Sequence, residues 1–353
     1  MAYKERMGDG RLVEMSKEEM IRDIEAGCND AAERGKISAL SEDAQERLLD
    51  IMISPERVAS VEPENTVVFS TDNGCHSLYG NFSEAGGVGL PIHSVTANML
   101  MERALGFDSV FYGWLDFCFK AAKAVITQHQ QELESILMNT VSPCIYGAMP
   151  NLGGYYKPDG PFENVGDLMA EGKILEGMEV YERLVDHAKE DIVWVSEQLT
   201  RVGVDCINID TTGAAGDGDF LSSLKACEEL KKQTGLSIEM GMASEFVMGI
   251  HGGLEYDGNV LAGMYPHKQV KMAEKAGVDI FGPVVNTNTR QSTPWNIARA
   301  ITFTKECSRV ANIPLHPNMG MGVGGLPMAE MPPLDAVTKA SKAMVELAGV
   351  DGI

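Results

Sequence analysis

Val202-Gly-Val-Asp205, Ala276-Gly-Val-Asp279 and Ala348-Gly-Val-Asp351 are three copies of one short motif, and they decide which fold the sequence predicts. Each copy closes a stretch with helical spacing and opens a run typical of a β-strand. Its glycine stands where the end of a helix favours a left-handed residue. A strand–helix unit used repeatedly along a chain is the pattern of a parallel sheet closed into a (β/α)₈ barrel.

The same rhythm extends on both sides of the motif. Seven β-branched or aromatic runs alternate with amphipathic stretches, and they cover residues 108–117, 142–151, 204–212, 236–245, 278–288, 313–320 and 350–353. The long second interval holds a segment rich in Gly, Pro and Tyr at 153–168, which we expect to be a lid or a wall of the site. A doubly wound open sheet is the alternative, although no Gly-x-Gly-x-x-Gly follows the first run.

The first hundred residues lack this rhythm. Ser16-Lys-Glu-Glu19 is a capping box that predicts the start of a helix, and Ser41 is predicted to cap a second one. We therefore expect an N-terminal helical cap at 1–100 and a (β/α) barrel at 101–353. The third copy of the motif opens a seventh strand just before Ile353, so the expected barrel is incomplete, with about six and a half βα units.

Composition excludes several classes of function. The net charge of −22 is unsuited to binding nucleic acid, whose phosphates need a basic surface. No run of eighteen apolar residues occurs, so we expect no membrane span. The seven cysteines are scattered singly without a Cys-x-x-Cys pair, and His251 and His267 lack metal-ligand spacing, so we expect no metal site and a reducing cytoplasm.

Candidate functional residues are expected where the predicted strands end, because barrel sites lie at the carboxyl ends of their strands. Nearly every strand end carries a polar pair. The seven candidates are Tyr146, Asn208, Asp210, Glu239, Asn286, His316 and Asn318. Two glycine-rich loops, 213–218 and 320–325, follow the third and sixth strands. They suit close approach of a flat cofactor or a partner surface better than phosphate, because Asp217 and Asp219 would repel phosphate.

Structural roles remain open for these residues. Asp210 could cap the following helix, and His316 could be a hydrogen-bonded core imidazole. Asn286 could satisfy loop backbone. A carboxylate within an apolar strand, such as that of Glu239, is costly unless it is paired, which favours a functional role there.

Several long segments resemble one known family, the pyrrolysine-containing dimethylamine methyltransferases. The likeness begins at Arg6 and runs to Ile353, and it is carried by stretches such as Tyr146-Gly-Ala-Met-Pro-Asn151, Asp210-Thr-Thr-Gly-Ala-Ala-Gly-Asp-Gly-Asp219 and Met319-Gly-Met-Gly-Val-Gly-Gly325. The resemblance implies a (β/α)₈ barrel and a cytoplasmic homo-oligomer. It also implies transfer of a methyl group from dimethylamine to the Co(I) corrinoid of a cognate corrinoid protein, in methylamine-dependent methanogenesis or methylotrophy.

In that family a pyrrolysine, encoded by an in-frame amber codon, follows the segment that in this sequence ends at Ile353. We therefore expect pyrrolysine just beyond Ile353, no cofactor bound directly, and a corrinoid carried by the partner. An inactive amber-truncated fragment is one alternative. A barrel lyase acting on a small carboxylate is another, but such an enzyme would use a Schiff-base lysine at a strand end, and we find none.

The resemblance does not fix individual roles, so these come from barrel geometry. We assign Glu239, Asp210 and His316 to catalysis, with the two acids as proton donors. Tyr146, Asn286, Asn208 and Asn318 are assigned to binding dimethylamine. An imine on pyrrolysine would bind the amine nitrogen and direct its methyl group toward cobalt, and cobalt would supply the nucleophile.

Overall fold

The computed structural model describes residues 2–65, 67–72, 77–79, 89–91, 111–115, 131, 133–134, 137–138, 144–250, 253–320, 322–328 and 332–353. The chain forms two compact units. Unit 1 consists of Met1–Thr71, Cys75–Tyr112 and Gly282–Ile353, and unit 2 consists of Asp72–Gly74 and Gly113–Phe281. The predicted division at residue 100 stays a prediction.

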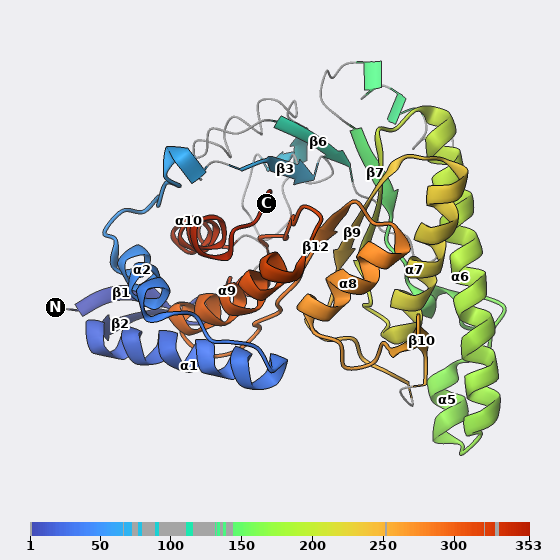
Figure 1. Cartoon of the computed structure of the whole chain (residues 1–353), viewed down its shortest axis with the longest axis horizontal. Coiled ribbons are helices and arrows are strands. Elements are labelled where there is room, and N and C mark those ends of the chain that lie inside the picture. Colours follow the sequence, from blue (N-terminus) through green and yellow to red (C-terminus); the bar gives the residue numbers. More distant parts are fainter. Residues whose placement is uncertain are drawn as a thin grey trace. The chain divides into compact units, whose positions relative to one another are not determined.

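A parallel sheet is the main feature of unit 2 (Figure 1). Strands β6 (Phe111–Leu115), β7 (Cys144–Ala148), β8 (Cys206–Thr212) and β9 (Ser237–Met242) pair in parallel with their sequence neighbours. Within unit 2 the described strands follow the order β12-β9-β8-β7-β6, in which β12 is Ile280–Gly282; strand β3 (Phe69–Asp72) lies mostly in unit 1. Fully buried apolar residues such as Ile207 and Ile238 explain why these runs form central strands. The predicted α/β class with a parallel sheet is confirmed.

Helices follow the strands of unit 2, as the alternation of sequence patterns predicts. They are α6 (Ile174–Val202), α7 (Asp217–Gln233) and α8 (Pro266–Ala276), with a small hairpin of β10 (Glu255–Tyr256) and β11 (Asn259–Val260) before α8.

The segment expected to be a lid or a wall folds into η3 (Leu152–Tyr155) and α5 (Val165–Ala170). Its buried Tyr155 and Leu168 share one apolar cluster with the preceding Leu152 and with Leu184 of α6. This segment therefore packs tightly against α6, which fits a wall better than a closing lid, and the prediction of a lid or a wall of the site stays a prediction.

Unit 1 begins with an antiparallel hairpin of β1 (Ala2–Arg6) and β2 (Leu12–Ser16), which sequence patterns did not predict. Helices α1 (Lys17–Gly35) and α2 (Glu42–Ile53) follow, and the capping box of Ser16 with Glu19 and the cap at Ser41 are both confirmed. The remaining elements are η1 (Pro63–Asn65), β4 (Ser77–Tyr79), β5 (Gly89–Pro91), α9 (Thr293–Val310), α10 (Leu334–Ala343) and the π-helical turn η4 (Met344–Ala348).

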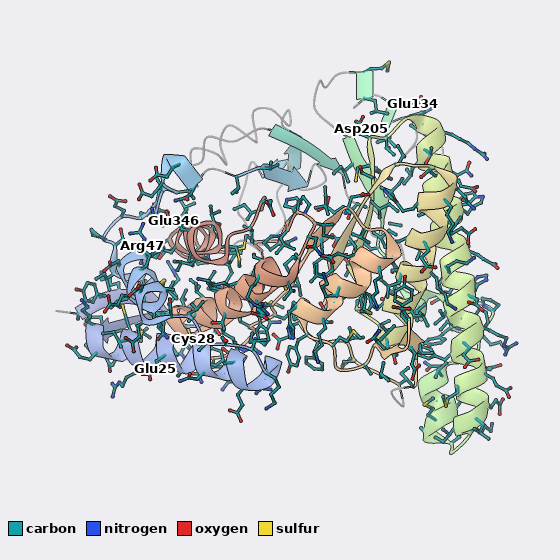
Figure 2. All side chains as sticks on the ribbon, viewed as in Figure 1. Glu25, Cys28, Arg47, Glu134, Asp205 and Glu346 are labelled. Atoms are coloured by element: carbon teal, nitrogen blue, oxygen red, sulfur yellow. The ribbon has the colours of Figure 1, made fainter. Side chains whose placement is uncertain are left out.

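Close packing and ion pairs join the two ends of the chain within unit 1. Helix α1 packs on α9 at Gly27, where an added Cβ would lie 2.3 Å from the carbonyl oxygen of Trp295. Arg47 of α2 donates to Glu346 of η4 at 2.7 Å (Figure 2). These contacts between distant segments explain why residues 282–353 belong to the same unit as the N-terminus.

The glycine of each motif copy ends a helix, as its sequence predicts. Gly203, Gly277 and Gly349 have φ angles of 101°, 91° and 71° and end the preceding helices in the left-handed conformation. This prediction is confirmed, and the position requires glycine because a Cβ would be strained there.

Two of the motif aspartates make the same pair of bonds. The Asp279 N–H donates to the carbonyl of Ile238, and the Asp279 carboxylate accepts from the N–H of that residue, both at 2.8 Å. Asp351 repeats this with Leu315, at 3.0 Å and 2.9 Å. Gly352 also forms a parallel bridge with Val68. The runs at 313–320 and 350–353 were predicted as strands, but the structure limits them to single bridge positions at Leu315 and Gly352.

We expect Asp279→Ala to lower the free energy of unfolding by about 1–3 kcal/mol, because the N–H of Ile238 loses its carboxylate acceptor. Lys231, 2.8 Å from Asp279, loses its ion-pair partner as well. Urea denaturation of the variant measures the loss. Glu182→Ala, which removes an exposed carboxylate of α6 in unit 2, is the matched control. A loss no greater than that of the control would show that the motif aspartate does not fasten the strands.

Candidate functional site

Three candidate side chains lie on one face of the sheet in unit 2. In β8 and β9, Asn208 pairs with Glu239, and Gly147 of β7 pairs with Asn208 in the same row. Paired residues of parallel strands project to the same face, and so do residues two apart. Asp210 therefore joins this row, and an added Cβ on Gly241 would lie 2.1 Å from its carboxylate oxygen. The structure thus brings together Asn208, Asp210 and Glu239 as the sequence predicts.

Asn208 is the unusual member of this row. Its side chain is fully buried, and neither its amide nitrogen nor its amide oxygen has a hydrogen-bond partner among the residues described. A buried amide without partners costs about 1–3 kcal/mol, so a purely structural role would be met better by an apolar residue. This side chain is therefore the strongest local indication of a ligand site.

The two acids of the row differ in their surroundings. Glu239 is 1% exposed within the apolar strand β9. Asp210 is half-buried at the end of β8, and its carboxylate accepts from the N–H of Thr211 at 2.7 Å. Thr211 has a φ of 56°, so Asp210 helps to hold a left-handed turn that begins the loop. The helix α7 begins only at Asp217, with Gly216 at its N-cap, so the alternative role of Asp210 as a helix cap was wrong.

Tyr146 belongs to the opposite face of the same sheet. It pairs with Ile207, which in turn pairs with Ile238, and this row alternates with the row of Asn208 and Glu239. The side chain is 1% exposed. The structure therefore does not place Tyr146 beside the two acids, and its assignment to substrate binding stays a prediction.

The other three candidates belong to unit 1. Asn286 forms an antiparallel bridge with Val323 of the second glycine-rich loop, which is held further by a bond from the Thr287 N–H to Gly322 at 3.0 Å. His316 is 6% exposed and follows the bridge residue Leu315, and an added Cβ on Gly352 would lie 3.1 Å from its ring.

Asn318 is exposed and precedes the second glycine-rich loop. The structure joins the segments that carry Asn286 and Asn318, and nothing tests the catalytic role of His316 or the binding roles of the two asparagines.

Two buried acids order the loops at the carboxyl ends of β8 and β9. Asp217 accepts from the Tyr181 hydroxyl at 2.9 Å, and its own N–H donates to the carbonyl of Met248 at 2.7 Å. Asp219 accepts from the N–H of Ala215 at 3.1 Å. Both carboxyl groups are fully buried. They connect the start of α7 with the loop after β8, with α6 and with the loop after β9, and so fix the end of the sheet where Asp210 lies.

Burial changes the acidity of this group of residues. It raises the pKa of Asp219 to about 7, although the bond from Ala215 acts in the opposite direction. Burial also raises the pKa of Asp217, partly offset by the bond from Tyr181. The pKa of the Tyr181 hydroxyl is raised as well, by burial first and by the nearby charge of Asp217 second.

Sequence reasoning noticed Asp217 and Asp219 only as residues that would repel phosphate, and it missed Tyr181 altogether. The helical spacing of α6 marks Tyr181 only as a core position, since a buried tyrosine and a buried leucine fit the same pattern. Two aspartates at a helix start carry a signal, because acids are favoured there by the helix dipole. Their burial could not be predicted from it.

Among the described residues, no three His, Cys, Asp or Glu side chains gather as metal ligands would. Within the same residues, no helix combines the length and the apolar character that a bilayer crossing requires.

Comparison with known proteins decides the family. The family model described as dimethylamine methyltransferase matches residues 1–353. This chain belongs to the dimethylamine methyltransferase family. The residues of the Asn208–Glu239 row are thus part of a methyltransferase of that family, and the resemblance seen in the sequence is confirmed.

Solved structures are only distantly similar. The YdjI aldolase from Escherichia coli K12 has 12% identity and a TM-score of 0.30, with 78% of this chain and 73% of that chain covered. A proposed fructose-1,6-biphosphate aldolase from Coccidioides immitis has 13% identity and a TM-score of 0.21, with 65% and 88% covered. At such scores neither structure informs the fold or the chemistry of this family member. The description of its fold therefore rests on strand pairing, and that of its chemistry on family membership.

Proposed function

We propose that this methyltransferase takes a methyl group from dimethylamine, leaves monomethylamine, and delivers the methyl group to the Co(I) corrinoid of a partner protein. The proposal depends most on one observation, the buried and unpartnered amide of Asn208 in the same row as Glu239. A closed barrel, a homo-oligomeric state and a cytoplasmic location are parts of the same proposal that follow from the family.

Asn208 and Glu239 supply complementary groups for a small amine. The amide oxygen of Asn208 accepts an N–H, and the carboxylate of Glu239 attracts the positive charge of a protonated amine. Asp210, more exposed in the same row, adds a second negative charge. A proton kept on the amine nitrogen by these acids makes that nitrogen a better leaving group, which is general acid catalysis.

Two groups beyond residues 1–353 complete the proposed chemistry. A corrinoid, when bound, supplies the cobalt nucleophile that accepts the methyl group. The surface of this chain that fits it is the loop after β9, where Phe246 and Met248 are 42% and 59% exposed although both are apolar. We choose this loop because these two apolar side chains lie four and six residues after the carboxyl end of β9 and close to each other in the sequence.

Pyrrolysine is the second group. It is proposed from the family alone to follow Ile353, where it would hold the amine nitrogen. None of the roles proposed for Asn208, Asp210 and Glu239 depends on its position. Mass spectrometry of the enzyme purified from its natural source tests this part, since a peptide that continues past Ile353 without pyrrolysine would contradict it.

The test of the amine site is Asn208→Leu in the natively produced enzyme. Leucine has a similar volume and removes a buried amide without partners, so we expect the melting temperature to rise or stay constant. The same variant is expected to raise KM for dimethylamine about fivefold, the effect of losing one net hydrogen bond. A structural role alone would change stability and leave KM unaltered.

The matched control is Ser222→Ala, which removes a buried hydroxyl of α7 that donates to the Asp219 carbonyl of the same helix at 2.9 Å. It is expected to leave KM unchanged. If Asn208→Leu also leaves KM unchanged, Asn208 does not bind the amine and the proposed site loses its main support.

A further inference from the structure

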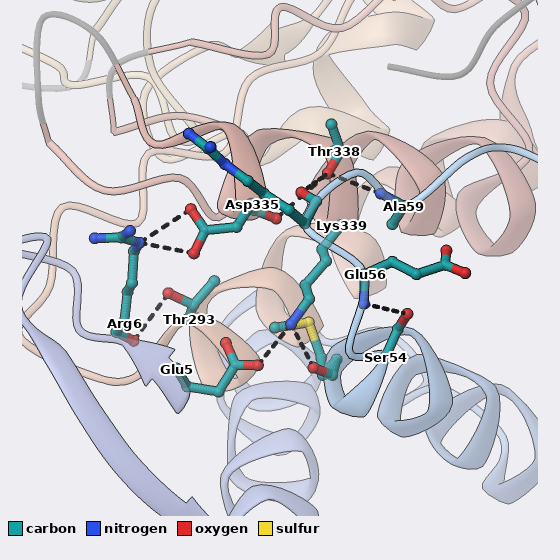
Figure 3. A network of polar contacts seen from close by, with 11 residues as sticks. Glu5, Arg6, Ser54, Glu56, Ala59, Thr293, Asp335, Thr338 and Lys339 are labelled. Carbon is teal, nitrogen blue, oxygen red and sulfur yellow. Dashed lines mark hydrogen bonds and ion pairs between the residues drawn. The ribbon is translucent and has the colours of Figure 1, made fainter. Parts of the chain in front are cut away.

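A cavity of about 580 Å³ opens in unit 1, and none of the seven candidate residues lines it. Three segments distant in sequence form it, namely β1, the loop after α2 and the start of α10 (Figure 3). Volumes of this size are typical of sites for small organic ligands. The presence of this cavity is therefore not explained by the site proposed for methyl transfer.

The charge of this cavity is opposite to that of the whole chain. Lys4, Arg6, Arg57 and Lys339 line it, against the two carboxylates of Glu56 and Asp335, so the lining carries a net charge of +2. The chain as a whole carries −22. A small basic cavity on an acidic protein concentrates anions locally and repels them elsewhere.

Two of the four cations are fixed in place before any ligand arrives. Arg6 contacts both carboxylate oxygens of Asp335, at 3.0 and 3.1 Å. Lys339 donates to Glu5 at 2.9 Å and to the carbonyl of Met52 at 2.6 Å, with both charged side chains at most 8% exposed (Figure 3). An ammonium group has three N–H donors, and these two bonds use two of them.

The other two cations are available. Lys4 and Arg57 are exposed, and neither makes an ion pair with any residue in the described part of the chain. They lie on two different walls, one on β1 and one after α2. Long flexible cations from two separate segments suit a ligand that carries two negative charges, because each can then pair with it.

The start of α10 adds a third attraction. Pro333, Leu334 and Asp335 line the cavity, and no side chain caps this helix. The first N–H groups of a helix lack partners within it and mark the positive end of its dipole, which favours a phosphate or carboxylate. The apolar side chains of Met52, Ile53 and Leu334 form the rest of the wall and fit a carbon skeleton.

We propose that this cavity binds a small phosphorylated organic molecule, with its phosphate between Lys4, Arg57 and the start of α10 and its carbon skeleton against Met52 and Ile53. Binding draws together β1, the loop after α2 and α10, and so stabilises unit 1. The proposal is independent of the amine site, because none of the cavity residues takes part in that site.

Glycerol 3-phosphate, inorganic phosphate, acetate and glycerol are the probes. Titration calorimetry and thermal melting are measured on the natively produced enzyme, on Lys4→Ala/Arg57→Ala and on Lys17→Ala/Arg22→Ala. The last variant removes two exposed cations of α1 in the same unit and outside the cavity, so its charge change is the same.

We expect glycerol 3-phosphate to bind and to raise the melting temperature, with acetate and glycerol without effect. Affinity should fall at least about tenfold in Lys4→Ala/Arg57→Ala, the loss of one charge-assisted hydrogen bond or more, and stay unchanged in the α1 variant. Absence of binding, or an equal loss in both variants, would overturn the site. Binding of inorganic phosphate as tight as that of glycerol 3-phosphate would overturn the role assigned to the apolar wall.

Discussion

Replacing Glu239 with glutamine is expected to slow methyl transfer from dimethylamine at least about tenfold, and by as much as about 10⁴-fold if Glu239 is the only acid. Glutamine keeps the size and the hydrogen-bonding shape of the side chain, but it can neither hold the acidic proton nor attract a protonated amine. Since Glu239 is 1% exposed, a carboxylic acid dissolved in the buffer does not reach its position and cannot replace its proton. The readout is the rate of corrinoid methylation at saturating amine.

Asp210→Asn and Glu255→Gln complete this experiment. Asp210 lies in the same row but is half-buried, so we expect a smaller loss of rate than for Glu239. Glu255 is an exposed acid on β10 in the same unit, and its variant should retain the normal rate. Unchanged turnover of Glu239→Gln would remove this residue from the mechanism. If Glu255→Gln lost as much rate as Glu239→Gln, the rate of methyl transfer would depend on the net charge of the protein and not on the position of Glu239.

The second large effect concerns stability and pH at Asp219. Its pKa lies at about 7 in the folded chain, against 3.8 for an ordinary aspartate. Folding therefore favours the protonated form, and the stability that this form confers is full below about pH 4 and is lost as the pH rises toward 7. Above pH 7 the burial of the charge costs up to about 4 kcal/mol, the equivalent of three pKa units.

Asp219→Asn removes this pH-dependent cost. We expect the variant to gain stability over the natural chain progressively between about pH 4 and pH 7, and to keep a constant advantage above that range. Urea denaturation at a series of pH values measures the difference. Asp186→Asn, an exposed aspartate of α6, is the control and should show no such trend. A difference that does not change between pH 4 and pH 7 would contradict the elevated pKa.

Local signals explain which parts of the fold the sequence predicts well. The glycine of each Gly-Val-Asp motif and the capping serines at Ser16 and Ser41 act within a few residues, so they fix where helices end and begin. The hairpin of β1 and β2 was missed because its strands are only five residues long, with one buried residue each, and because its position depends on distant contacts such as that of Arg6 with Asp335.

The sequence also predicts the part of the candidate site that depends on alternation within one strand, and it does not predict the part that depends on how strands pair. Alternation along β8 and β9 places Asn208, Asp210 and Glu239 on one face because strand register and side-chain direction follow from a period of two. Tyr146 was grouped with them because the register between β7 and β8 cannot be read from either strand alone. The same limit applies to Tyr181, whose bond to Asp217 joins residues 36 positions apart.

The aspartate bonds at the start of β12 and beside Leu315 have a consequence for protein engineering. Each of these two motifs carries its own attachment to the segment before it, at Ile238 and at Leu315. In unit 2, Ile238 lies at the amino end of β9, whereas Asp217 and Asp219 order the loops at the carboxyl ends of β8 and β9. A helix together with its Gly-Val-Asp ending is therefore a cassette that could be exchanged between relatives. The graft would bring its attachment with it, while the loops that Asp217 and Asp219 order would stay those of the host.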